Sequence, residues 1–108
     1  VNLLLDTHVA LWALTDPRNV VAVSAATVWE VEIKRALGKL DAPDDFAAEC
    51  VARGFDELPI TFDHAEAACR LPPYHHDPFD RMLLAVCACE GLKLVTTDTA
   101  LAGHRLVY

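Results

Sequence analysis

The stretch Leu3-Leu-Leu-Asp-Thr-His-Val-Ala-Leu-Trp-Ala-Leu14 joins a short apolar run to a helical pattern. The run from Val1 to Leu5 predicts a buried strand, and Asp6-Thr7 ends it. Thr7 is a favoured helix N-cap, so a helix is expected from there to about Leu14. Short apolar runs alternate with helical patterns along the rest of the chain, and this order predicts an α/β domain with a mostly parallel sheet.

The later elements are expected to continue this alternation. Ser24 is the expected N-cap of a long helix, and Pro43 is the expected first residue of the next one. Pro59 predicts that its strand lies at an edge or is very short, because proline has no amide hydrogen to donate. The expected strands cover residues 20–23, 57–60, 93–96 and 105–108, and the expected helices cover residues 25–40, 43–52, 63–71 and 78–90.

The composition indicates one globular domain over residues 1–108. Hydrophobic residues make up 54% of the chain and charged residues 23%, which excludes a disordered protein. Sixteen acidic residues against nine basic ones give a net charge of −7. This balance argues against a protein that coats nucleic acid or binds a membrane through positive charge. It leaves a nucleic-acid enzyme open, because catalysis needs only local positive charge.

The connection between the first two expected strands is short. Thirteen residues separate Asp6 from Val20, which is close to the lower limit of about 10–12 residues for a crossover between parallel strands. We therefore hypothesise that a helix-sized segment is absent between Arg18 and Asn19. The hypothesis concerns only this junction and leaves the single-domain assignment unchanged.

The compartment expected from the sequence is the cytosol. No apolar run reaches the roughly 18 residues that a membrane helix needs, and no signal peptide is visible after Val1. The cysteines form no CxxC pair for zinc. We interpret all four as reduced thiols of the core, as is usual in the cytosol: Cys50, Cys69, Cys87 and Cys89.

Two aspartates follow expected strands in the same way. Asp6 comes after residues 3–5, and Asp98 comes after residues 94–97. Ligands of parallel sheets bind beyond the carboxyl ends of the strands, so these carboxylates would converge if the strands are neighbours. Their mutual repulsion would favour a bound cation such as Mg²⁺ or Mn²⁺. The alternative for each aspartate is a simple helix N-cap.

Two further acids have both a functional and a structural interpretation. Asp80 lies three residues after Asp77 at the start of an apolar helix, and we favour Asp77 as the cap and Asp80 as the outward-facing ligand. Glu30 lies in the second turn of its helix, near the same end of the sheet. Its alternative role is a solvated i,i+4 pair with Lys34. Glu32 lies about 200° round the helix from Glu30, so both cannot face one site.

Four motifs, in this order, resemble the PIN domain family, and most of all the VapC-type toxins of bacterial type II toxin–antitoxin modules. Each motif alone is weak, but the four together are specific and span the chain from Val1 to about Val107. They are Leu3-Leu-Leu-Asp-Thr-His8, Val23-Ser-Ala-Ala-Thr-Val-Trp-Glu-Val-Glu-Ile-Lys34, His76-Asp-Pro-Phe-Asp-Arg-Met-Leu-Leu-Ala85 and Leu94-Val-Thr-Thr-Asp98.

The resemblance implies a small three-layer α/β/α domain that acts as a metal-dependent endoribonuclease. It implies Mg²⁺ or Mn²⁺ as the cofactor, RNA as the substrate, a VapB-like antitoxin as the partner, and a homodimer. Carried over motif by motif, the metal-binding and catalytic acids are Asp6, Glu30, Asp80 and Asp98, with Thr7 and Thr97 as supporting residues. The candidates for binding RNA phosphates are Lys34, Arg35 and Arg81.

Two other functions are compatible with a small acidic α/β domain. A receiver-type phospho-acceptor domain also gathers aspartates and Mg²⁺ at strand ends, but it needs a lysine after a late strand, where this chain has Thr97-Asp98. A non-catalytic interaction domain could keep the PIN fold alone. The complete set of four acids argues against this second alternative.

Overall fold

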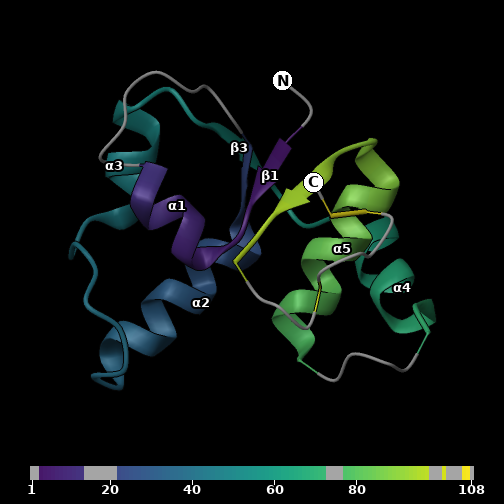
Figure 1. Ribbon diagram of the computed structural model, residues 1–108, viewed down its shortest axis with the longest axis horizontal. Coiled ribbons are helices and arrows are strands. Elements are labelled where there is room, and N and C mark those ends of the chain that lie inside the picture. The colour runs from purple at the N-terminus through teal and green to yellow at the C-terminus, as the bar shows by residue number, and fades with distance from the viewer. Residues whose placement is uncertain (1–2, 14–21, 73–76, 98–100, 102–105, 108) are drawn as a thin grey trace.

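The computed structural model describes residues 3–13, 22–72, 77–97, 101 and 106–107. In this part of the chain, short strands alternate with helices as expected (Figure 1). The strands are β1 (Leu3–Leu5), β2 (Ala22–Ser24), β3 (Asp56–Leu58) and β4 (Lys93–Val95). The helices are α1 (Thr7–Ala13), α2 (Ala25–Ala36), α3 (Phe46–Ala52), α4 (Phe62–Arg70) and α5 (Pro78–Glu90).

The four strands form one parallel sheet in the order β3-β2-β1-β4. Leu4 is in register with Ala22 on one side and with Leu94 on the other. β3 lies at an edge, with Pro59 directly after it, as the missing amide hydrogen of proline predicts. Because β1 and β4 are parallel neighbours, their carboxyl ends lie side by side at the same edge of the sheet.

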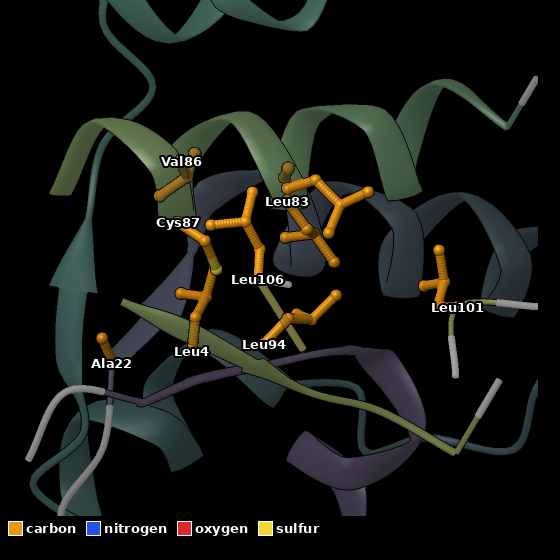
Figure 2. Packing of buried hydrophobic residues seen from close by; sticks show 10 residues of the cluster. Leu4, Ala22, Leu83, Val86, Cys87, Leu94, Leu101 and Leu106 are labelled. Carbon is orange, nitrogen blue, oxygen red and sulfur yellow. The ribbon is translucent and has the colours of Figure 1, made fainter. Parts of the chain in front are cut away.

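Alternating side chains of the strands supply a separate core on each face of the sheet. Leu4 and Ala22 belong to a cluster that includes Leu83 of α5 (Figure 2). Leu5 and Val23 point the other way and join a second cluster, to which helices α1, α2 and α3 also contribute. Since successive side chains of a strand lie on opposite faces, this pattern produces the expected three-layer α/β/α domain.

Two helix ends differ from expectation. α2 ends at Ala36 rather than near Leu40, because Gly38 has a positive φ of 70° and its amide bonds back to the carbonyl of Arg35. α3 begins at Phe46, not at Pro43, and its N-cap residue is Asp45. Pro43 could have occupied the first position of a helix, but a proline alone does not determine where a helix begins.

The C-terminal strand is reduced to a single bridge within the described residues. Val107 bridges Leu94 in parallel, and the amide of Leu94 donates to the carbonyl of Leu106 at 2.7 Å. Residues 105 and 108 of the expected strand lie outside the described residues. The hypothesis about the Arg18–Asn19 junction also lies outside them.

The cysteines divide into two buried and two exposed thiols. Cys50 and Cys87 are buried, and burial raises their pKa to about 11 and about 12. Cys69 and Cys89 are exposed, so the expectation of four core thiols is wrong for these two. Both lie on outward-facing positions of amphipathic helices, where a small side chain is tolerated. No helix among the described residues is long and apolar enough to cross a membrane.

Candidate active-site cleft

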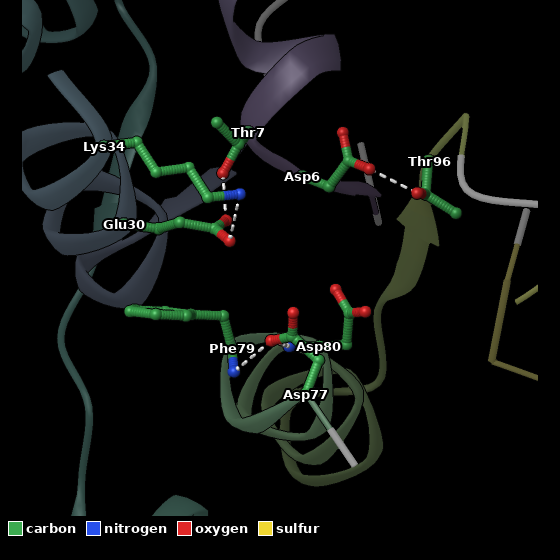
Figure 3. Close-up of polar contacts among 8 residues, drawn as sticks. All are labelled: Asp6, Thr7, Glu30, Lys34, Asp77, Phe79, Asp80 and Thr96. Atoms are coloured by element: carbon green, nitrogen blue, oxygen red, sulfur yellow. Dashed lines mark hydrogen bonds and ion pairs between the residues drawn. The ribbon is translucent and has the colours of Figure 1, made fainter. Parts of the chain in front are cut away.

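Asp6 stands at the carboxyl end of β1 and starts α1. Its Oδ1 accepts the amide of Val9 at 3.0 Å, and its backbone carbonyl accepts the amide of Ala10. Asp6 is therefore the N-cap of α1, in place of the expected Thr7. The second carboxylate oxygen, Oδ2, accepts a hydrogen bond from the Thr96 hydroxyl just beyond β4 (Figure 3). These contacts orient the Asp6 carboxylate between two strand ends.

Glu30 is a buried carboxylate on the second turn of α2. Only 7% of its surface is exposed. The Thr7 hydroxyl donates to its Oε1, and the Lys34 ammonium lies 3.0 Å from its Oε2 (Figure 3). Thr7 is itself buried, so the bond joins the start of α1 to α2. Glu32 instead pairs with Arg35, as expected from its place on the other side of the helix.

The start of α5 supplies the remaining described acids. Asp77 is its N-cap and accepts the amides of Phe79 at 2.8 Å and Asp80 at 3.2 Å. Asp80 follows in the first turn and is half-buried. The Phe79 ring meets the Trp29 ring edge-on, with centroids 5.3 Å apart and planes at 65°. Glu30 follows Trp29 in α2, and Asp80 follows Phe79 in α5. The ring contact therefore fixes the spacing between the two helices that carry these acids.

The side chains converge on one cleft of about 280 Å³. Three of the four predicted acids line it, together with the predicted supporting threonines. Its lining consists of Asp6, Thr7, His8, Glu30, Lys34, Asp77, Asp80 and Thr97. The fourth predicted acid, Asp98, lies outside the described residues. The cleft therefore collects oxygen donors from the ends of β1 and β4 and from the amino-terminal halves of α2 and α5.

The donors have the chemistry that a hard divalent cation requires. Carboxylate and hydroxyl oxygens are the ligands preferred by Mg²⁺ and Mn²⁺. Within residues 3–13, 22–72 and 77–97, however, no three acid, histidine or cysteine side chains stand close enough to form a ready metal-binding group. Asp6 and Glu30 are held instead by hydroxyl, amide and ammonium donors of the chain itself. A metal would have to replace some of these contacts.

The predicted phosphate-binding residues have different surroundings. Lys34 lines the cleft. Arg35 pairs with Glu32 and Asp44 away from it. Arg81 donates to the carbonyls of Ala68, Leu71 and Pro72 at 2.7–3.0 Å, and so ties α5 to the end of α4. Binding of RNA by these three residues stays a prediction, and the two arginines have clear structural partners.

Three residues in or beside the cleft were not predicted as part of the site. Thr96, rather than Thr97, holds Asp6, because the residue directly after β4 faces the neighbouring strand end. His8 is an exposed residue that lines the cleft one position after Thr7, in the first turn of α1. Asp77 lines it as well as capping α5. Position beside a strand end or helix start was the available signal for each.

Comparison with protein-family models gives one match that covers almost the whole chain, the PIN domain over residues 3–104. The chain belongs to the PIN domain family. Curated protein sequences gave no match to this PIN domain. The four motifs on which the sequence resemblance rests all lie within residues 3–104.

Two solved structures of similar fold come from toxin–antitoxin systems. One is a toxin–antitoxin complex from Klebsiella pneumoniae, with 22% sequence identity and a TM-score of 0.69; the match covers 97% of this PIN domain and 94% of that chain. Another is VapBC-5 of the VapBC family from Mycobacterium tuberculosis, with 25% identity and a TM-score of 0.60, covering 100% of this chain and 97% of that one. This PIN domain therefore has the fold of proteins from such systems over nearly its full length.

Proposed function

We propose that this PIN domain is the VapC-type toxin of a type II toxin–antitoxin system, a Mg²⁺-dependent endoribonuclease that hydrolyses RNA phosphodiester bonds. The observation that carries the proposal is the convergence of Asp6, Glu30 and Asp80, from three separate elements, on one cleft of a PIN domain. Asp98 is proposed as the fourth acid, because in the sequence it comes soon after β4, and β4 is the neighbour of β1, which Asp6 follows.

The chain's own residues would bind and orient the reacting groups. The acids would hold Mg²⁺, or Mn²⁺, and none of them needs to act as a nucleophile. When bound, such an ion lowers the pKa of a water and stabilises charge on a phosphodiester. Thr7 and Thr96 fix the orientation of Glu30 and Asp6 through their hydroxyl groups. The ring contact of Trp29 with Phe79 keeps α2 and α5 in register at the cleft.

The site and the similar solved structures support a substrate class and an antitoxin partner. A small open cleft suits single-stranded or looped RNA, because it cannot read the deep groove of a duplex. The similar structures come from toxin–antitoxin systems, and this supports a VapB-like antitoxin whose chain covers the acids. We also propose a homodimer and a place in the cytoplasm, where RNA and reduced cysteines are found.

The test is an RNA cleavage assay with purified protein. Wild type is expected to cleave RNA in Mg²⁺ and to stop in EDTA. Asp6→Asn and Asp98→Asn should each lower the cleavage rate at least about 100-fold, because even the outer partners of metal ligands are worth roughly 10- to 100-fold. Asp41→Asn, which changes an exposed acid away from the cleft, is the matched control and should keep full activity.

Three results would contradict the proposal. Cleavage that survives EDTA and both substitutions would show that another site, or a contaminating nuclease, is responsible. A protein that cleaves no RNA but takes up label from acetyl phosphate on an aspartate would be a receiver-type domain. A protein with neither activity would keep the fold as an interaction domain only.

A further inference from the structure

The pair of Lys34 with Glu30 occupies the place where a metal ion would act. The ammonium Nζ lies 3.0 Å from Oε2, and both side chains line the cleft with Asp6 and Asp80 (Figure 3). The Glu30 side chain is 9% exposed and the Lys34 side chain 40% exposed. The pair is thus a buried acid met by a half-exposed cation, unlike a solvated pair on an outer helix face.

A buried carboxylate needs a positive partner, because leaving a charge uncompensated away from water costs free energy. Thr7 satisfies one oxygen of Glu30 with a hydrogen bond but brings no charge. Lys34 supplies the charge at the other oxygen. A divalent cation at the same carboxylate would supply it in the same way, so the two cations are alternatives.

The two partners of Glu30 differ in how easily they can leave. Thr7 is 4% exposed and stands at the first position of α1, so its hydroxyl is held in place. Lys34 has a flexible four-carbon stem whose head reaches water from a 40% exposed side chain. Exchange of the ammonium for a metal would therefore leave the Glu30 carboxylate correctly oriented.

We propose that Lys34 is an internal counter-ion that competes with the divalent cation for Glu30 and so sets how tightly the cleft binds metal. The inference rests on the proposed function, since it assumes that Glu30 is a metal ligand. It makes Lys34 a positioning residue, which holds the Glu30 carboxylate in place and compensates its charge until the metal displaces the ammonium from Oε2.

The experiment is a calorimetric Mn²⁺ titration of the purified protein and its variants. Lys34→Gln removes the competitor, so we expect Mn²⁺ to bind roughly five- to tenfold more tightly than to wild type. An ordinary solvated i,i+4 pair would change the affinity by only about twofold. Lys34→Arg keeps a cation beside Glu30 and should stay within about twofold of wild type.

Lys39→Gln is the matched control for net charge. It removes one positive charge from the exposed segment after α2 without touching Glu30. If general electrostatics alone mattered, Lys39→Gln and Lys34→Gln would tighten Mn²⁺ binding equally, and that outcome would overturn the inference. Circular dichroism of each variant checks that the fold is kept, and Lys34→Met replaces Lys34→Gln if the latter does not fold.

A crystal soaked in Mn²⁺ gives a second, direct readout. The Lys34 Nζ is expected beyond salt-bridge distance, about 4 Å, from Glu30 Oε2. If wild type binds Mn²⁺ but Lys34 stays on Glu30, or Lys34→Gln binds no more tightly, the inference fails and the proposed function stands. If neither wild type nor Lys34→Gln binds Mn²⁺, the proposed metal site fails and the inference falls with it.

Discussion

Two side-chain pairs with the same nitrogen-to-oxygen distance lie in different parts of the molecule. In one, His64 Nε2 of α4 lies 3.0 Å from Glu90 Oε2 of α5. In the other, Lys34 Nζ lies 3.0 Å from Glu30 Oε2 at the cleft. Each pair joins one buried side chain to one that is about 40% exposed. They differ in which partner is buried and in what else that partner binds.

In the first pair the buried partner is His64, and both of its ring nitrogens make hydrogen bonds within the fold. The His64 Nδ1 accepts the amide of Thr61, while the Thr61 hydroxyl accepts the amide of His64, which together form a capping box. Because Nδ1 is an acceptor, the proton of the neutral ring lies on Nε2 and is donated to Glu90. This pair starts α4 and joins it to α5.

The buried partner of the second pair is an acid that faces a cleft. Glu30 binds one fixed hydroxyl and one exchangeable ammonium. The comparison teaches that burial and pair distance alone do not separate a structural pair from a functional one. What separates them is the surroundings of the buried group: His64 is part of a capping box, whereas Glu30 faces a cleft in which its ammonium partner can be replaced from solvent.

The largest expected effect is on the cleft pair. Glu30→Gln should lower Mg²⁺-dependent RNA cleavage by about 100- to 1000-fold, equivalent to about 3–4 kcal/mol of transition-state stabilisation. It should change stability little, because glutamine can still accept from Thr7 and Lys34 can extend into water. Cleavage rate and urea denaturation, measured on the same preparation, check both halves. A large loss of stability with unchanged activity would show that Glu30 has a structural role and not a catalytic one.

The next effect is on the helix pair. His64→Ala should lower the free energy of unfolding by about 2–3 kcal/mol, since it removes a buried ring, one member of a capping box and the partner of Glu90. The cleavage rate of the folded fraction should stay within about twofold of wild type. Urea denaturation and a cleavage assay well below the midpoint measure these two quantities. A loss of activity in fully folded protein would show that the His64–Glu90 pair also affects catalysis, and the contrast between the two pairs would not hold.

The smallest effect is expected for the exposed member of the helix pair. Glu90→Gln keeps an acceptor for His64 Nε2 but loses the charge, and it should cost about 0.5–1 kcal/mol of stability. Thermal denaturation at neutral pH checks this. A cost as large as that of His64→Ala would mean that the charge of Glu90, rather than the histidine ring and its capping box, holds α4 on α5.

Much of the fold could be predicted from local patterns. Alternating runs and helices predicted the parallel sheet, Pro59 predicted the edge strand, and Asp77 predicted the start of α5. Helix ends were less predictable. The start of α3 at Phe46 and the end of α2 at Ala36 depend on packing and on the turn at Gly38, which periodicity does not encode.

The sequence predicted which acids belong to the site, but it did not predict which side chains contact one another there. Asp6, Glu30 and Asp80 were expected together and line one cleft. The sequence could not choose Thr96 over Thr97 as the partner of Asp6, because this depends on the register of β1 and β4. It treated the Lys34 pair and a cleft position for Glu30 as alternatives, whereas both hold at once.

The central claim is that a divalent ion held by the cleft acids acts on the RNA phosphate. The most direct test is cleavage of an RNA with a single phosphorothioate at a mapped scissile bond. We predict that sulfur slows cleavage in Mg²⁺, a hard ion, and that Mn²⁺ restores the rate because it accepts sulfur better. A sulfur effect that is absent, or that is equal in Mg²⁺ and Mn²⁺, would contradict the account.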